Sequence, residues 1–353
     1  MIRTTYNPWL TRFAWLTAAA TLVLISVGGL VTSHEAGMSV PDWPNSYGYN
    51  MFFFPVSKWV GGIFYEHTHR LVASGVGLLT TVLAAWLWVK ESRPWMRWLG
   101  VVAFVSVVVQ GVLGGLRVTL LKDELGIFHA AIAQLFFCLT VAIALFSGRW
   151  WQSLRAGLAP DRRLSRSLWL TVGIILGQLI LGATMRHQHA GLAIPDFPLA
   201  YGRWWPAMDP QAVSTYNQNR METGGEAPVT PFQVGLQMIH RLVALAIVVL
   251  VSSIAWLARS RPGSSGILAR GTTVWWVLIV VQAGLGAATI WTGKSADVAT
   301  AHVTVGALSL ATGIWLALTA SRLRRLAASR IGGKNRATQP HSISPRSFLP
   351  EAS

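Results

Sequence analysis

Cysteine and acidic residues are scarce in this chain. Its 353 residues include one cysteine, Cys138, and only 13 Asp and Glu against 29 Lys and Arg. A single cysteine excludes an intramolecular disulfide, and its place inside an apolar segment favours a packing role over redox chemistry. The excess positive charge is spread over several loops, so we expect no nucleic-acid binding, for which basic residues gather on one face.

Charged residues of both signs make up only 12% of the chain, whereas 52% of the residues are hydrophobic. With a mean hydropathy of +0.46, this composition excludes an ordinary soluble domain and predicts an integral membrane protein in contact with lipid. A membrane span needs about 20 apolar residues, and lipid offers backbone polar groups no partner outside a helix. Eight segments qualify, namely 10–31, 67–89, 97–118, 127–147, 168–186, 234–257, 272–292 and 298–320.

The basic residues indicate the orientation of these spans. With the N-terminus inside, 20 of the 29 Lys and Arg fall on the cytoplasmic side, as the positive-inside rule requires. The first apolar segment is too long for the core of a cleavable signal, and no long Arg- and Ser-rich transit peptide precedes it. We therefore expect a multi-pass protein of the bacterial plasma (inner) membrane, with both termini cytoplasmic and long outer loops at 32–65 and 187–233.

The two halves of the chain repeat one another. SHEAGMSVPDWPNSYG after the first segment matches HQHAGLAIPDFPLAYG after the fifth at a constant offset of 154, and VVVQGVLGGL matches IVVQAGLGAA at 172. Because each repeat holds four segments, both halves start on the same side of the membrane. The sequence predicts an all-α fold of two tandem four-helix bundles, related by a pseudo-two-fold axis along the membrane normal.

The expected divisions follow from this repeat. Residues 1–150 form the N-terminal four-helix half and residues 151–321 the C-terminal half. Residues 322–353 are basic and poor in apolar side chains, so we expect a disordered cytoplasmic tail.

Four histidines lie near the outer ends of the second, fourth, sixth and eighth segments. The spacing from His69 to His129 is 60 residues, and that from His240 to His302 is 62. Ligand-type side chains inside apolar segments are costly and usually mark function. A lone intramembrane histidine is commonly a hydrogen-bonded packing residue, but two repeat-equivalent pairs favour two six-coordinate haem irons, each between two imidazoles.

Other polar residues also recur in both halves. Gln110 and Gln282 either hydrogen-bond the ligands or haem propionates, or join helices beside the small residues of GVLGGL and AGLGAA. Arg70 and Arg241 directly follow a histidine of each half, and they either pair with propionates or extend toward lipid headgroups. The sequence leaves both alternatives open.

Glu66 breaks the symmetry between the halves. It precedes His69 by three residues and so shares its helix face, whereas Gln237 stands at the equivalent place before His240. A carboxylate there is positioned for proton transfer or for stabilising positive charge. The alternative is a carboxylate that only stabilises the helix N-terminus.

With these residues in place, the chain resembles the haem A synthases. The resemblance covers residues 10–320 and rests on Glu66-His67-Thr68-His69-Arg70, His129, His240-Arg241 and His302, within the duplicated four-helix architecture. It implies oxidation of the C8 methyl of haem O to a formyl group by successive hydroxylations, which supplies haem A to cytochrome oxidases.

The resemblance also implies a division of roles. The N-terminal half would hold the substrate haem O on His69 and His129, with Glu66 as the essential carboxylate. The C-terminal half would hold a haem b on His240 and His302 that passes electrons. The implied partners are membrane lipid, haem O and the enzyme that makes it, and an electron donor or acceptor that the sequence does not identify; a homo-oligomer is compatible with it.

The first outer loop departs from the family pattern. Some members carry a cysteine pair there, whereas residues 32–65 contain none, so a mechanism using loop thiols is excluded for this chain. Three loop histidines, His34, His187 and His189, either form a metal site or are solvated, and we expect them to be solvated.

Two other classes of protein remain as alternatives. A di-haem b electron-transfer subunit that oxidises quinol would share the histidine pairs but not the Glu66/Gln237 difference. A transporter with buried histidines as proton relays would show broken helices near the middle of the membrane.

Overall fold

The computed structural model describes residues 6–155, 160–222, 227–260 and 266–337, with side chains as far as Arg330. Within this part of the chain, eight helices are long and apolar enough to cross a membrane. They are α1 (Pro8–Ser33), α2 (Gly62–Lys90), α3 (Pro94–Thr119), α4 (Glu124–Ser147), α6 (Arg162–His187), α8 (Pro231–Ser260), α9 (Gly266–Trp291) and α10 (Ala296–Ala337). The eight predicted spans are confirmed. Most helix ends lie within a few residues of the predicted ends, several helices extend further, and the largest extension is at the C-terminal end of α10.

Local sequence explains where several helices begin. Pro8 and Pro94 stand in the first turns of α1 and α3. The N–H group that proline lacks would have no partner within the helix at this position, so proline costs no hydrogen bond there. The Asn7 side chain accepts a hydrogen bond from the Trp9 backbone at 3.0 Å, and Asp161 accepts one from the Arg163 backbone at 2.9 Å. Side-chain caps of this kind satisfy the free N–H groups at a helix start.

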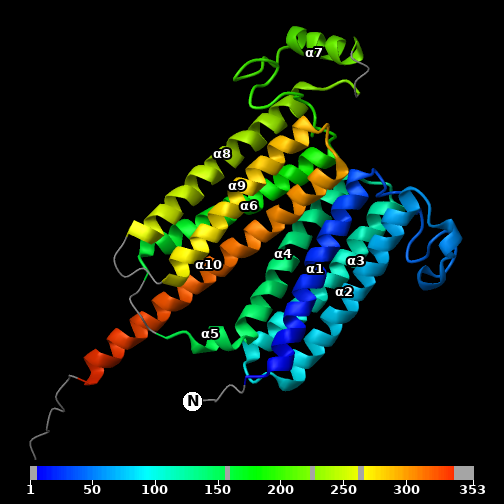
Figure 1. Ribbon diagram of the computed structural model, residues 1–353. Helices are drawn as coiled ribbons and strands as arrows, with labels where there is room; N and C mark the ends of the chain where they lie inside the picture. The colour runs from blue at the N-terminus through cyan, green and yellow to red at the C-terminus, as the bar shows by residue number, and fades with distance from the viewer. Residues whose placement is uncertain (1–5, 156–159, 223–226, 261–265, 338–353) are drawn as a thin grey trace, which may run out of the picture.

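The long helices form two packed groups. α1 packs against α2 and α4, and α3 packs against α2 and α4; in the second group α8 packs against α6 and α9, and α10 packs against α6 and α9. Contacts of α1 and α4 with α10, and of α4 with α6, join the groups (Figure 1). This arrangement is consistent with the predicted tandem bundles.

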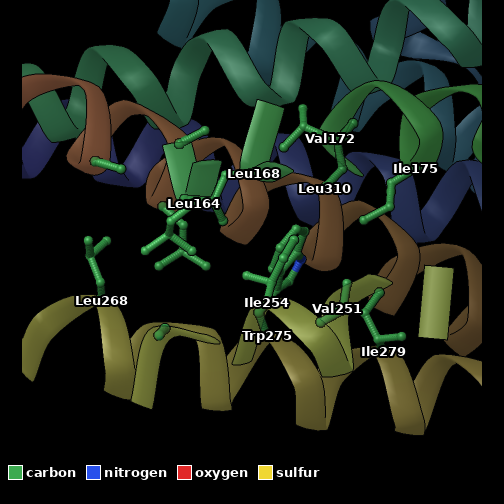
Figure 2. Packing of buried hydrophobic residues seen from close by; sticks show 14 of the residues in the cluster. Leu164, Leu168, Val172, Ile175, Val251, Ile254, Leu268, Trp275, Ile279 and Leu310 are labelled. Carbon is green, nitrogen blue, oxygen red and sulfur yellow. The ribbon is translucent and has the colours of Figure 1, made fainter. Parts of the chain in front are cut away.

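Lipid tails are as apolar as the side chains that the helices bury, so moving these side chains out of lipid gains little free energy. Each group is therefore held together by close packing of its helices. Figure 2 shows the core of the second group, where Leu168, Val251, Trp275 and Leu310 meet from four helices. The Trp275 indole also donates a hydrogen bond to the Ser309 carbonyl at 2.8 Å. The first group has its own core, which includes Val76, Leu83, Leu87, Met96 and Ile143.

Small and polar residues connect the two groups. Ser26 of α1 and Thr304 of α10 share a hydrogen bond of 2.8 Å. A Cβ added to Gly29 would lie 3.2 Å from the Thr300 side chain, so this glycine permits the close approach of α1 and α10. Such contacts are typical of helix pairs in membranes.

Both long loops lie at one end of the bundle, called here the loop side, and α1 begins at the opposite end (Figure 1). The first loop contains the short helices η1 (Met51–Phe53) and η2 (Val56–Lys58), and the second contains α7 (Pro210–Glu222). A further short helix, α5 (Arg149–Ser153), lies at the opposite end.

The last helix is longer than the sequence predicted. α10 continues past residue 321 to Ala337, with Leu323 and Ala327 buried one turn apart. The predicted start of a disordered tail at residue 322 is therefore wrong, because the basic segment keeps apolar side chains at helical spacing. Residues 338–353, including His341, lie outside the described residues.

Candidate functional site

Each of the four intramembrane histidines lies against a glycine of the preceding long helix. A Cβ added to that glycine would stand 3.1–3.4 Å from the imidazole. The four pairs are Gly28 with His69, Gly114 with His129, Gly182 with His240, and Gly286 with His302. The glycines correspond across the repeat at the same offsets of 154 and 172 as their helices. A larger side chain at any of them would push the imidazole away.

The histidines form one pair in each half. His69 of α2 and His129 of α4 lie close enough to interact electrostatically, as do His240 of α8 and His302 of α10. The Nδ1 atoms of His129, His240 and His302 are buried without a hydrogen-bond partner among the described residues. These Nδ1 atoms lie on the side of the facing glycines, 3.8–4.0 Å from the added Cβ, so an iron would be held through the other ring nitrogen of each imidazole.

Two such imidazoles suit the axial positions of a haem iron, whose porphyrin supplies the other four ligands. Within the described residues, no group of three or more His, Cys, Asp or Glu side chains is placed to hold a metal ion by itself. The residues present therefore fit a porphyrin in each half better than a bare ion.

Glutamine side chains fix the backbone of two histidines. Gln110 of α3 donates from Nε2 to the His129 carbonyl at 3.0 Å, and Gln178 of α6 donates to the His240 carbonyl at 2.9 Å. Gln282, the counterpart of Gln110, lies instead against Gly306 of α10. The Oε1 atoms of all three glutamines are buried without a partner among the described residues, so each retains a free acceptor.

Glu66 is buried at the joint between α2 and the first loop. Its Oε2 accepts a hydrogen bond from the Val40 backbone at 2.8 Å, and its Oε1 forms an ion pair with Arg70 at 2.8 Å. Gln237 is buried at the matching joint, where its Oε1 accepts from the Ile194 backbone at 2.6 Å. The two residues thus occupy the same structural place, as the repeat predicted.

Arg70 and Arg241 attach the loops to their helices. Arg70 donates to the carbonyls of Asp42 at 2.6 Å and Asn45 at 2.9 Å, and Arg241 donates to those of Asp196 at 2.7 Å and Leu199 at 2.9 Å. These bonds use the terminal guanidinium nitrogens that a propionate would need. A role for either arginine in propionate binding stays a prediction.

The loop turns repeat bond for bond. Asp42 accepts hydrogen bonds from the backbones of Tyr47 and Gly48 at 2.7 and 2.8 Å, and Asp196 accepts from Tyr201 and Gly202 at the same two distances. Burial raises the pKa of Asp42, but these backbone donors and the Arg70 guanidinium outweigh it and hold the pKa below its ordinary value. The PDWP and PDFP segments are therefore rigid turns.

His67 is a buried residue that the sequence reasoning left without a role. Its Nδ1 lies 3.1 Å from the Ser46 hydroxyl, and its ring contacts those of Phe54 and Trp59. Met238 takes its place in the second half. The run of four polar residues, Glu66-His67-Thr68-His69, was the available signal, and His67 anchors the first loop to α2.

The three loop histidines have separate surroundings. His34 stacks on Tyr65 at 3.9 Å between ring centres, and His189 lines a cavity of about 300 Å³ with Glu35, Arg220 and Lys294. His187 is the last residue of α6, and its side chain is only 8% exposed. The expectation that His187 is solvated is therefore wrong, because α6 extends one residue further and turns it toward α4.

Two arginines that sequence reasoning passed over lie inside the bundle on the loop side. Arg117 of α3 forms an ion pair with Asp123 at 3.0 Å. Arg186 of α6 donates to the Gly29 carbonyl and to the Ser33 hydroxyl of α1. Their position near the ends of predicted spans was the signal, but it did not distinguish them from arginines that extend to headgroups.

Comparison with known proteins agrees with this arrangement. The family model of the cytochrome oxidase assembly proteins matches residues 11–314. The chain belongs to this family. Its relatives include proteins named haem A synthase from Rhizorhabdus wittichii (27% identical, over 85% of this chain and 91% of the relative), a Chelativorans species (28%, over 88% and 91%) and Geobacillus kaustophilus (25%, over 88% and 92%). The matched range includes both histidine pairs and both long loops.

Proposed function

We propose that this protein is a haem A synthase that oxidises the C8 methyl group of haem O to a formyl group by successive hydroxylations. Family membership and relatives of that name along most of the chain support the proposal. The observation that carries it is the pair of equivalent bis-histidine sites with a carboxylate, Glu66, at only the first.

We assign the substrate haem O to the first half, between His69 and His129, and a haem b to the second half, between His240 and His302. The repeat-equivalent glycines that face all four histidines support both assignments. When bound, the haem b supplies electron transfer.

Glu66 is the proposed proton-transfer group. It lies one helical turn from His69, and Arg70 balances its charge at Oε1. Its second oxygen holds the first loop through Val40, so movement of the proton at Oε1 leaves this attachment intact. The second half has a glutamine here and lacks a proton acceptor of this kind.

The deciding experiment is co-expression of the protein with a haem O source, followed by extraction and mass analysis of the haems. We expect haem A to appear only with the intact protein. Unchanged haem b and haem O would favour a di-haem b subunit that oxidises quinol, and the absence of bound haem would favour a transporter.

We further propose that the protein lies in the bacterial plasma membrane with both termini cytoplasmic and the loop side outside. The distribution of Lys and Arg, 20 against 9, supports this orientation. Reporter fusions at Ser260, at the end of α8, and at Ser214, in α7, should label opposite sides. Labelling on one side would contradict it.

A further inference from the structure

A cluster of basic side chains lies where the two halves meet on the loop side. Arg117 comes from the last turn of α3, and Arg186 and His187 come from the last turn of α6. The two arginines interact electrostatically with each other. Asp123 accompanies them, 3.0 Å from Arg117 and 3.8 Å from His187.

The cluster is anchored in both halves. Arg186 belongs to the second half but hydrogen-bonds α1 of the first half, at 3.0 Å from the Gly29 carbonyl and 2.6 Å from the Ser33 hydroxyl. The Arg117 guanidinium lies against Gly37, where an added Cβ would be 2.7 Å from Nη1. Gly37 thus leaves the room that this side chain needs.

Among the described residues, Asp123 balances only part of the positive charge of the cluster. Asp123 is the carboxylate paired with Arg117, and its side chain is 46% exposed, whereas that of Arg117 is 16% exposed. The Nε atoms of both arginines are buried and have no hydrogen-bond partner among the described residues. Keeping two guanidinium groups together in this position is costly, so an anionic ligand is the expected reason.

Each arginine is near a different histidine pair. Arg117 lies one helical turn after Gly114, the glycine that faces His129, and Arg186 lies one turn after Gly182, the glycine that faces His240. The repeat places threonines, Thr289 and Thr32, at the equivalent positions. The two arginines are therefore not a duplicated structural feature, and they belong to the interface between the sites.

We propose that Arg117 and Arg186 bind the propionate carboxylates of the two porphyrins, Arg117 in the first half and Arg186 in the second. This inference rests on the proposed function, because it requires a porphyrin between each histidine pair. A guanidinium group donates charge-assisted hydrogen bonds to a carboxylate, and the unpartnered Nε atoms of Arg117 and Arg186 are available for such bonds while Nη2 of each keeps its protein partner.

Haemin and its dimethyl ester, in which the carboxylates are blocked, provide the test. Each is titrated into the detergent-solubilised, haem-depleted full chain carrying His69→Ala, which leaves the second pair intact. Loss of a charge-assisted hydrogen bond costs roughly 10–100-fold in affinity. We expect Arg186→Gln to weaken haemin binding by about that factor and to leave the ester unaffected.

The matched control is Arg322→Gln, which removes one positive charge from α10 where Arg322 lies over Trp151 of α5, the short helix at the end opposite to the loop side. It should change neither titration. The corresponding experiment for Arg117→Gln uses the His240→Ala background, with Arg117→Lys expected to recover part of the haemin affinity. Normal helix content by circular dichroism shows that each variant is folded.

A second measurement is the midpoint potential of the haem in the second half. Removal of a nearby positive charge disfavours the reduced iron, so Arg186→Gln should lower the potential, whereas Arg117→Gln should have a smaller effect. Equal weakening of haemin and ester, or an effect that disappears when anionic phospholipid is removed, would overturn the proposal by indicating a structural role or a lipid headgroup. Failure of the parent chain to bind either porphyrin would instead overturn the proposed function itself.

Discussion

The two halves join a histidine-bearing helix to its long loop in the same place but with different chemistry. In the second half, Gln237 accepts from the Ile194 backbone and donates to the Ile194 carbonyl at 3.3 Å. In the first half, Glu66 accepts from the Val40 backbone but has no amide to donate, and Arg70 donates to the Val40 carbonyl at 2.7 Å. The glutamine shows that this joint can form without a carboxylate, so we expect the carboxylate of Glu66 to have a further role, as proposed above.

The difference between the histidine pairs gives the largest expected effects. His240→Ala or His302→Ala should abolish the stable low-spin haem b spectrum, because one axial ligand is lost. His69→Ala or His129→Ala should keep that spectrum and lose haem O occupancy and turnover. Visible spectra of the purified variants measure both, and a normal haem b spectrum in both C-terminal variants would exclude those ligands.

Glu66→Gln makes the first joint resemble the second. We expect the fold and the haem b to remain, because the glutamine can bond Val40 as Gln237 bonds Ile194. Haem A production should fall by roughly 10²–10⁴-fold, the range for loss of a general acid–base group, and haem O should accumulate. Haem extraction and mass analysis measure this, and production at the parent rate would show that Glu66 only holds the loop.

The reverse change, Gln237→Glu, should destabilise the second half. The new carboxylate would face the carbonyls of Gly191 and Ile194, which now accept from the amide nitrogen at 3.3 Å. An unsatisfied buried acceptor costs about 1–3 kcal/mol, so haem b should be released at a lower temperature. Gln211→Glu, on the exposed surface of α7, is the control for added charge. Unchanged release would mean that Arg241 turns to pair with the carboxylate, as Arg70 does in the first half.

The glycines that face the histidines offer a smaller effect. A Cβ on Gly286 would lie 3.1 Å from His302, whereas one on Gly284 of the same helix would meet nothing within 4 Å. Gly286→Ala should therefore weaken haem b binding by about fivefold, since mild overpacking costs about 1 kcal/mol, and Gly284→Ala should not. Haem titration compares them, and equal affinities would show that the imidazole has room to move.

The smallest expected effect concerns pH and the first loop. The pKa of Asp42 is held below its ordinary value in the folded protein. Its contribution to stability is therefore present above the unfolded pKa of about 3.9 and is lost as the pH falls through the folded value. Limited proteolysis of the loop should be faster in Asp42→Asn than in the parent at pH 7, and the difference should vanish in acid. A difference that persists in acid would exclude the carboxylate as its cause.

The sequence by itself determined the eight spans, the duplicated halves and the four histidines. Apolar length decides a membrane span because lipid cannot satisfy a broken backbone. The repeat identified the equivalence of Glu66 and Gln237, because each precedes the equivalent histidine of its half, His69 or His240, by three residues. These features depend on local spacing, which the sequence displays directly.

Only the tertiary structure decided which groups meet across helices. It paired each histidine with a glycine of another helix, bonded Gln178 to the His240 carbonyl, and brought Arg117 and Arg186 together between the halves. Residues 117 and 186 are far apart in the chain, and neither belongs to a repeated motif. Their proximity follows from the packing of α4 against α6 and of α1 against α10, because the rotation of a helix about its axis is set by contacts with its neighbours and not by its own sequence.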